Sequence, residues 1–266
     1  MVTDVQSSPL TALTPPAQDK TLDFILGGVQ KSGTTALSRY LEDLPGVHLQ
    51  PKEIHFFDDE TGVDWSAPDY GLYHQRVGGS SLSLRGESTP IYLYWPNSLE
   101  RIRAYAPDIK LIFIFRDPIE RAWSQWRMER ARGLETQSFA WCVRQGRERL
   151  AYSETPGFHR VRSYVERGFY GSQVERLLRL FNRDQVLFLR SEDLEDDAGR
   201  VLAQVCDFIG APAPVGPITP RRERVGAEVG GAGMTPDDTA MLRQIFDPEM
   251  EAFTDLTGLQ VARWRR

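Results

Sequence analysis

The chain has 266 residues, of which 41% are hydrophobic and 26% are charged. This length suffices to bury a sizeable core, in one large α/β domain or in two small ones. The formal net charge of −5 gives no support to broad nucleic-acid binding, and no apolar run approaches the length that spans a membrane.

The N-terminus lacks the basic start and apolar run of a secretory signal peptide. The two cysteines, Cys142 and Cys206, have no metal-ligand spacing and are typical of buried thiols in a reducing compartment. We therefore expect a cytoplasmic protein.

The predicted elements follow a leader at residues 1–20, whose Ser, Thr, Pro and Gln show no apolar pattern and predict a flexible segment. Apolar, β-prone runs predict strands at 22–29, 48–49, 110–116 and 186–189. Helical patterns predict helices at 34–43, 97–106, 118–131 and 196–209, with a last helix from about 236. Residues 60–81 have the character of an insertion with aromatic anchors at Trp65, Tyr70 and Tyr73.

The segment Ser172-Gln-Val-Glu175 matches a helix capping box. Behind it an apolar stripe, expected to pack in the core, is formed by Val174, Leu177, Leu178 and Phe181.

Strands that alternate with helices indicate an α/β fold, in which a P-loop-like, mostly parallel central sheet carries helices on both faces of a single domain at 21–266. The run at 110–116 is continuously apolar until its final Arg, as in a strand buried on both faces of such a sheet. Ligands of these sheets bind at the carboxyl ends of the strands, where the loop at 27–35 is expected to lie.

The stretch from Phe24 to Leu37, FILGGVQKSGTTAL, predicts an anion site between a strand and a helix N-terminus. Gly28 and Gly33 have the spacing of a P-loop, but Thr34 follows where a Walker loop has lysine, and Lys31 lies earlier. This arrangement argues against a nucleoside triphosphate held with magnesium and suits a nucleotide whose reactive bond lies just beyond one phosphate. The alternative is an ordinary glycine turn in a βα unit.

A second cluster is the segment Pro51-Lys-Glu-Ile-His-Phe-Phe-Asp58. On an extended segment the two-residue period places Glu53 and His55 on one face, as a plausible proton-accepting pair. The alternative is a surface Glu and a core His satisfied by a carboxylate such as Asp58.

A third cluster begins at Arg116, at the end of the predicted strand 110–116, where a charged side chain is costly unless it meets an anion. Ser124 follows two helical turns later, so both side chains are candidates to hold one phosphate. The alternative is that Arg116 pairs with Asp117 or with a glutamate at the strand end.

The three clusters together resemble the sulfotransferases that use 3′-phosphoadenosine 5′-phosphosulfate (PAPS). The resemblance rests on Lys31-Ser-Gly-Thr-Thr35, on Lys52-Glu-Ile-His-Phe-Phe-Asp58 and on Arg116-Asp-Pro-x-x-Arg-x-x-Ser124. It covers residues 22–210 and is greatest with the heparan sulfate N- and 3-O-sulfotransferases and their bacterial relatives.

The resemblance implies that the loop after the first strand holds the 5′-phosphosulfate of PAPS. The matching positions are Gln30, Lys31, Ser32, Gly33, Thr34 and Thr35. Lys31 is then expected to stabilise the bridging oxygen as the S–O bond breaks, whereas Arg116 and Ser124 bind the 3′-phosphate.

Glu53 is implied as the base that takes the acceptor's proton, with His55 assisting or orienting it. A late basic loop closes over the nucleotide in this family, and the loose match here is 220–226. Its arginines, Arg221, Arg222 and Arg224, either contact the nucleotide or form a solvated face.

The implied reaction is an in-line transfer of the sulfuryl group to a hydroxyl, less favourably an amine, of a carbohydrate or small natural product. No Asp/His set has metal-ligand spacing, and we expect transfer without a metal. The 3-O enzymes carry a lysine where this chain has Ser88, so a polysaccharide contact is expected to be missing. The acceptor pocket is expected from 60–81 and 135–170, whose aromatic side chains either stack on the acceptor or fill the core.

Two other functions stay open on the residues alone. A P-loop nucleoside or small-molecule kinase would need a lysine directly after Gly33 and an acidic magnesium ligand, for which Asp117 is the candidate. A non-catalytic nucleotide- or carbohydrate-binding module is the other. The sequence does not indicate an oligomeric state.

Overall fold

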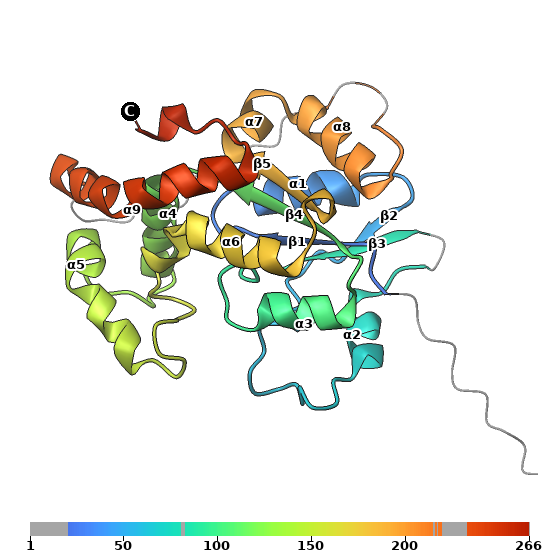
Figure 1. The fold of residues 1–266 in the computed structure, drawn as a ribbon, viewed down its shortest axis with the longest axis horizontal. Helices are drawn as coiled ribbons and strands as arrows, with labels where there is room; N and C mark the ends of the chain where they lie inside the picture. The colour runs from blue at the N-terminus through green and yellow to red at the C-terminus, as the bar shows by residue number, and fades with distance from the viewer. Residues whose placement is uncertain (1–20, 81–82, 215, 217, 220–232, 266) are drawn as a thin grey trace, which may run out of the picture.

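Five parallel strands form the centre of the molecule, in the spatial order β2-β3-β1-β4-β5 (Figure 1). The computed structural model describes residues 21–80, 83–214, 216, 218–219 and 233–265. The strands are β1 (Phe24–Gly28), β2 (Val47–Leu49), β3 (Leu84–Ser88), β4 (Lys110–Phe115) and β5 (Val186–Arg190). The α-helices are α1 (Thr34–Glu42), α2 (Tyr70–Val77), α3 (Ser98–Tyr105), α4 (Pro118–Ala131), α5 (Phe139–Arg144), α6 (Tyr170–Leu180), α7 (Ser191–Asp196), α8 (Ala198–Ile209) and α9 (Pro236–Thr257). Short 3₁₀ helices are η1 (Gly146–Tyr152), η2 (Glu166–Gly168), η3 (Arg183–Gln185) and η4 (Ala262–Arg265).

Both faces of the sheet are covered by helices, because the two central strands present apolar side chains in both directions (Figure 1). Leu111, Phe113 and Phe115 of β4 pack with residues of α3, α6 and α9. Ile112 and Ile114, which point the other way, pack with residues of α1 and α8. All five side chains are fully buried. The predicted parallel α/β sheet with helices on both faces is confirmed.

The strand β3 was not expected from the sequence, because Leu84-Arg-Gly-Glu-Ser88 contains no β-branched residue and two charged ones. Pairing with neighbours on both sides makes it a strand: Gly86 lies opposite Phe24 of β1 and Leu49 of β2. A Cβ atom on Gly86 would lie 2.4 Å from the Phe24 ring, so glycine is what allows this close approach.

The expected insertion at 60–81 contains the helix α2. Asp69 is its N-cap, and the Asp69 carboxylate accepts a hydrogen bond from Leu72 N at 2.9 Å. Tyr73 is fully buried in the core, so the aromatic anchor predicted there packs inward. The predicted helix at 196–209 is α8, which begins two residues later because Asp197 is its N-cap and accepts a hydrogen bond from Arg200 N at 2.9 Å. The short helix α7, which precedes it, was not predicted.

The capping box predicted at Ser172 is wrong. Helix α6 begins two residues earlier, at Tyr170, and its N-cap Phe169 makes no side-chain capping bond. The backbone N–H of Ser172 instead donates to Glu249 of α9 at 2.8 Å, because α6 and α9 pack side by side. The apolar stripe of α6 does pack in the core, where Val174 and Leu177 are fully buried.

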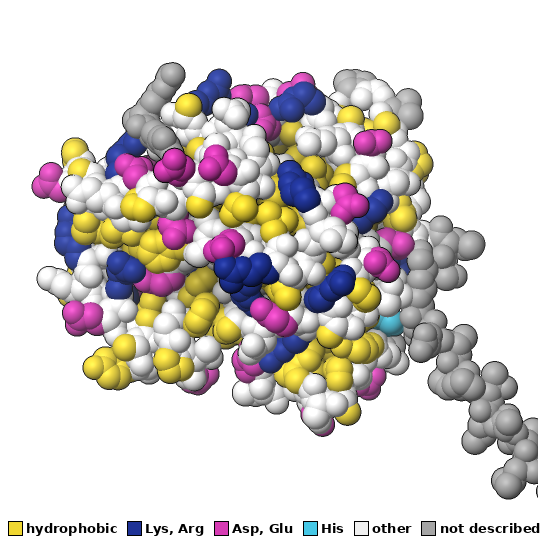
Figure 2. Space-filling view, in the orientation of Figure 1, with side chains coloured by type: hydrophobic (Ala, Val, Ile, Leu, Met, Phe, Trp, Pro, Cys, Tyr) yellow, Lys and Arg dark blue, Asp and Glu magenta, His cyan; other side chains and the backbone are white. Residues whose placement is uncertain are grey.

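Both cysteines, Cys142 and Cys206, are buried free thiols, as expected. No helix in the described part of the chain is long and apolar enough to span a bilayer. On the face seen in Figure 2, the described Lys and Arg side chains are interspersed with Asp and Glu. The division of the chain into a leader and one domain, and a cytoplasmic location, stay predictions.

The order of the strands determines where a ligand can bind. The chain leaves β1 toward β2 and β3 on one side and later returns to place β4 on the other. At such a switch point the connections diverge and open a crevice outside the carboxyl ends of the strands. The loop after β1 therefore borders a crevice of this kind.

Candidate active site

A cleft of about 2080 Å³ opens at the carboxyl edge of the sheet. It is lined by the loop after β1, by residues near β3 and α4, and by α7 and α8 on the far side. The structure brings together in this lining the predicted site residues Gln30, Lys31, Gly33, Thr34, Thr35, Glu53, His55, Arg116 and Ser124. Ser32 is fully buried and does not line the cleft.

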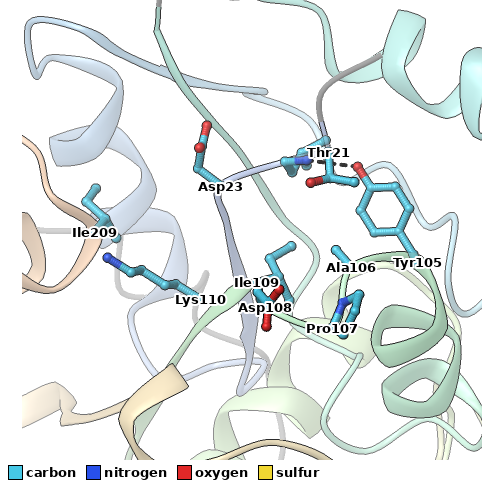
Figure 3. Close-up of a pocket in the computed structure, with 10 residues that line it drawn as sticks. Thr21, Asp23, Tyr105, Ala106, Pro107, Asp108, Ile109, Lys110 and Ile209 are labelled. Carbon is cyan, nitrogen blue, oxygen red and sulfur yellow. Dashed lines mark hydrogen bonds between the residues drawn. The ribbon is translucent and has the colours of Figure 1, made fainter. Parts of the chain in front are cut away.

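A smaller hollow of about 320 Å³ lies where β1 and β4 begin (Figure 3). It is lined by 21–23, 105–110 and Ile209. None of the predicted site residues lies there, so the site is at the opposite ends of these strands.

The loop after β1 has the backbone of an anion site. Gly33 adopts a φ of 94° and Lys31 a φ of 74°, so left-handed residues alternate with Ser32 just before α1. The N–H of Val29 donates to Ile114 O at 2.9 Å, which holds the loop against β4. Left-handed residues beside a helix N-terminus turn successive backbone N–H groups toward one concave side, where they attract anions.

Lys31 is the cation of this loop. Its Nζ lies 3.6 Å from Met128 Sδ on α4. Burial, and then the neighbouring Arg132, lower the pKa of Lys31 below its ordinary value. A lysine in this setting releases its proton more readily than a solvated one and is only weakly held by its thioether neighbour.

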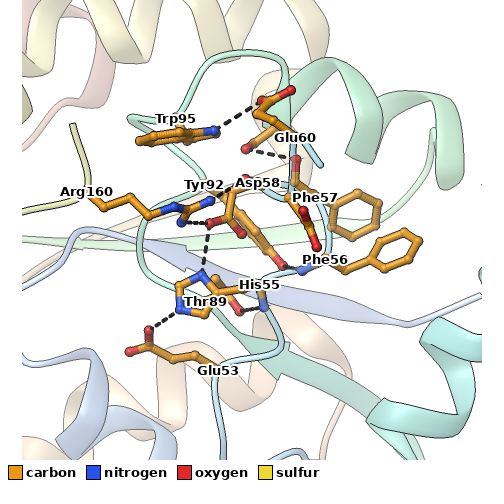
Figure 4. Close-up of polar contacts among 12 residues, drawn as sticks. Glu53, His55, Phe56, Phe57, Asp58, Glu60, Thr89, Tyr92, Trp95 and Arg160 are labelled. Carbon is orange, nitrogen blue, oxygen red and sulfur yellow. Dashed lines mark hydrogen bonds and ion pairs between the residues drawn. The ribbon is translucent and has the colours of Figure 1, made fainter. Parts of the chain in front are cut away.

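The segment at 53–58 forms a turn in which two carboxylates flank one imidazole (Figure 4). His55 Nε2 lies 3.0 Å from Glu53 Oε2, and His55 Nδ1 lies 2.9 Å from Asp58 Oδ2. Hydrogen bonds to Asp58 and to Glu53 raise the pKa of His55 to about 9. At neutral pH His55 therefore carries a positive charge between the two carboxylates.

Sequence reasoning placed Glu53 and His55 together for an incorrect reason. His55 adopts a φ of 54°, so the segment is not a regular extended strand and the two-residue period does not apply to it. Of the alternative, the contact of the imidazole with Asp58 is present, but His55 is not a core residue, because 43% of its side chain is exposed. Asp58 is fully buried; burial would raise the pKa of its carboxyl, but the hydrogen bonds from His55 and Arg160 outweigh burial and lower it.

Arg116 and Ser124 lie on one wall of the cleft, at the end of β4 and on α4. Arg116 Nη2 lies 3.2 Å from Glu120 Oε2, so the pairing with a glutamate that the sequence left open is present. Both side chains of this pair are partly exposed, at 34% and 45%, so the ion pair is weak enough for an anion to compete with it.

Two arginines that the sequence analysis did not single out connect the loop after β1 to this turn. Arg160 donates to the carboxylate of Asp58 and lies over the Trp95 ring at 4.4 Å (Figure 4). Arg167 is almost fully buried, and donates to the side chain of Gln30 and, at 2.6 Å, to Arg160 O. Burial lowers the pKa of Arg167 to about 10. Arg160 and Arg167 follow an irregular part of the chain, so no helical or strand periodicity in the sequence indicates their positions.

The aromatic side chains expected to shape an acceptor pocket mostly fill the core. Tyr73, Tyr164 and Tyr170 are fully buried, and Tyr152 is exposed outside the cleft. Among the described residues of the expected segments 60–81 and 135–170, the cleft is lined only by Thr61, Arg160 and Val161. The arginines proposed at 221, 222 and 224 lie outside the described residues.

An α/β fold with a glycine-containing loop at the switch point, and a carboxylate–histidine pair in the same cleft, is the architecture expected of a transferase that binds a nucleotide. Residues 21–226 match the sulfotransferase domain family, and the chain belongs to this family. The family prediction made from the three clusters is confirmed.

Several curated relatives are heparan sulfate enzymes. The chain is 32% identical over 189 residues to heparan sulfate glucosamine 3-O-sulfotransferase 6 of Homo sapiens, which covers 70% of this chain and 51% of the relative. It is 31% identical over 206 residues to heparan sulfate glucosamine 3-O-sulfotransferase 3B1 of Mus musculus, and this match covers 76% of this chain and 50% of the relative. The chain thus spans about half the length of these relatives.

Solved structures show the same fold. A sulfotransferase from Alicyclobacillus acidocaldarius superimposes with a TM-score of 0.78 at 25% identity, covering 93% of this chain and all of that one. Mouse sulfotransferase SULT7A1, crystallised with PAP, gives a TM-score of 0.52 at 16% identity over 89% of this chain and 88% of its own, a likeness of fold alone.

Proposed function

We propose that this chain transfers a sulfuryl group from PAPS to a hydroxyl group of a carbohydrate or small natural product. The observation that carries the proposal is that Lys31, on the loop after β1, lines the same cleft as Glu53 and His55, with Asp58 buried behind His55. Membership of the sulfotransferase family supports PAPS as the donor.

The residues of the cleft fit the anionic groups of this donor. The backbone N–H groups of the loop at 30–35 and the N-terminus of α1 suit the 5′-phosphosulfate. Arg116 and Ser124, on the wall formed by the end of β4 and by α4, suit the 3′-phosphate. The basic loop at 220–226 is proposed to cover the nucleotide.

In the proposed reaction the acceptor oxygen attacks sulfur in line with the bridging oxygen of PAPS. The S–O bond to that oxygen breaks, adenosine 3′,5′-bisphosphate (PAP) leaves, and the acceptor's proton passes to Glu53. Lys31 stabilises the charge that grows on the bridging oxygen. Since His55 already holds its proton at neutral pH, Glu53 is the base of the pair and His55 orients it.

A kinase is the weaker candidate. Thr34 occupies the position of the Walker lysine. The carboxylate of Asp117, the candidate magnesium ligand, accepts a hydrogen bond from Ile119 N at 2.8 Å and caps α4. In the described part of the chain no group of three or more His, Cys, Asp or Glu side chains is arranged to hold a metal.

The acceptor is proposed to be a hydroxyl compound, because the curated relatives are named as 3-O-sulfotransferases. A long heparan-like chain is less favoured, since Ser88, which replaces the lysine of those enzymes, is buried and does not line the cleft.

The proposal is tested by calorimetry with PAP and with ATP plus magnesium. PAP is expected to bind and ATP to bind far more weakly; the reverse result refutes a PAPS enzyme. Incubation with PAPS and a panel of hydroxylated acceptors, followed by mass spectrometry, identifies products heavier by one sulfuryl group. With such an acceptor, Glu53→Gln is expected to lower turnover by about 10²- to 10⁴-fold with PAP affinity kept. Glu175→Gln, at an exposed carboxylate of α6 outside the cleft, is the matched control.

A further inference from the structure

A fully buried carboxylate, Glu87 on β3, lies beneath the turn at 53–58. We propose that Glu87 is a positioning residue for the transfer reaction: through the hydroxyl groups of Thr89 and Tyr92 it fixes the backbone that carries Glu53 and His55. This inference rests on the proposed role of Glu53 as the base.

Three hydroxyl groups donate to Glu87. Thr89 Oγ1 donates to Glu87 Oε2 at 2.7 Å. Tyr92 OH donates to Oε1 at 2.8 Å, and Tyr73 OH donates to the same oxygen at 3.0 Å. Above a pH of about 7 the Glu87 carboxylate is ionised and has no proton to give, so each of the three hydroxyl groups must donate its single proton to it.

Two of these hydroxyls then accept hydrogen bonds from the turn (Figure 4). Thr89 Oγ1 accepts from Ile54 N at 3.2 Å and, at the limit of 3.5 Å, from His55 N. Tyr92 OH accepts from Phe56 N at 3.3 Å. Three consecutive N–H groups are thus held by oxygens whose protons point away from the turn, toward Glu87.

The turn needs this support. His55 has a φ of 54°, a left-handed conformation that is unfavourable for a residue with a side chain. The side chains of His55 and Glu53 are 43% and 47% exposed, so packing on the cleft side constrains them little. The hydrogen bonds from below hold the backbone in the one conformation that places Glu53 Oε2 3.0 Å from His55 Nε2.

The charge of Glu87 matters because it dictates the direction of every hydrogen bond. Burial raises the pKa of Glu87 to about 7, against the three hydroxyl bonds that lower it. The titratable groups that face it are Asp58, Tyr73, Tyr92 and Tyr105. In Glu87→Gln the amide N–H₂ group would donate to one of the hydroxyl oxygens. That hydroxyl would then turn its proton away from residue 87, and the amide would compete with the backbone N–H groups of the turn for its oxygen.

Thr89 offers the sharpest pair of variants. Thr89→Val keeps the shape and removes the hydroxyl, whereas Thr89→Ser keeps the hydroxyl. Thr89→Val is expected to lower the pKa of His55, measured by NMR titration, from about 9 by about one unit or more, and to lower turnover about tenfold or more. Thr89→Ser is expected to keep both values near those of the parent protein.

The tyrosines supply a second pair of variants. Tyr92→Phe removes a hydroxyl that touches the turn, and Tyr73→Phe removes one that touches only Glu87 in this network. Tyr73→Phe loses one buried hydrogen bond and Tyr92→Phe loses two, so Tyr92→Phe is expected to lose more stability. Only Tyr92→Phe is expected to shift the titration of His55. Glu87→Gln is expected to shift it as well.

PAP affinity, measured by calorimetry, separates this inference from the proposed function. If the parent protein fails to bind PAP, the function is refuted, while the His55 titrations still decide the inference. An unchanged His55 pKa in Thr89→Val, or equal shifts in Tyr92→Phe and Tyr73→Phe, overturns the inference. If Thr89→Val does not fold, Glu87→Gln and the tyrosine pair decide it by the same readout.

Discussion

Asp58→Asn tests the charge arrangement of the site most directly. Asp58 is fully buried and accepts hydrogen bonds from His55 Nδ1 at 2.9 Å and from Arg160. The asparagine keeps the shape and removes the charge. His55 then keeps only Glu53 as an anionic neighbour, and its pKa is expected to fall from about 9 toward its ordinary 6.5.

The size of the effect follows from the pKa difference. At 1.36 kcal/mol per pKa unit, a value of about 9 against 6.5 corresponds to at most ~3.4 kcal/mol. Since 43% of the His55 side chain is exposed, solvent screening reduces this contribution to ~1–2 kcal/mol. The pKa is raised on folding, so the stabilisation is complete below pH 6.5 and is lost as the pH rises through about 9.

The assay is urea unfolding followed by tryptophan fluorescence at several pH values from 7.5 to 10. The parent protein is expected to lose stability over this range more steeply than Asp58→Asn. The lost contact with Arg160 lowers the stability of the variant by an amount that does not change with pH here, because arginine stays charged. Asp59→Asn, at the adjacent carboxylate, is expected to keep the parent slope. Parallel curves for Asp58→Asn and the parent would refute a protonated His55 held by Asp58.

Further predictions concern the donor side of the cleft. Lys31→Met is expected to lower turnover about 10²- to 10³-fold with PAP affinity nearly kept. The lowered pKa of Lys31 also predicts that the turnover of the parent protein begins to fall below pH 10.5 as the pH is raised, and a turnover that stays constant up to that pH would contradict this. Arg116→Ala is expected to weaken PAP binding in calorimetry about tenfold or more, whereas Glu120→Gln, which removes the competing carboxylate 3.2 Å away, is expected to tighten it about twofold. Gly33→Ala is expected to lower stability in urea unfolding by ~1–2 kcal/mol, because the residue has a φ of 94°; unchanged stability would show that the loop adopts another conformation.

Local patterns in the sequence were enough to predict much of the fold. The continuously apolar run of β4 predicted one central strand. The stretch from β1 to α1 predicted the other central strand and the glycine-containing loop that follows it. The predicted strands are present because the information lies within a few residues: a continuously apolar run is typical of a strand buried on both faces. The loop after β1 has left-handed residues before a helix N-terminus, and its binding of an anion stays a prediction. The candidate residues Lys31, Glu53 and Arg116 were found in the same way, from motifs in short segments.

The strand β3, the hydrogen bonds that Thr89 and Tyr92 accept from the turn, and the contacts of Arg160 and Arg167 could not be predicted, because each depends on partners far away in the chain. Leu84–Ser88 becomes a strand only between β1 and β2. Arg160 reaches Asp58 across 102 residues, and Arg167 reaches Gln30 across 137. The sequence alone thus determined which side chains are available for chemistry and the loop that presents one of them. Only the tertiary structure decided that Glu53 and Asp58 enclose one protonated imidazole, because burial and charge at a point in space are set by the whole fold.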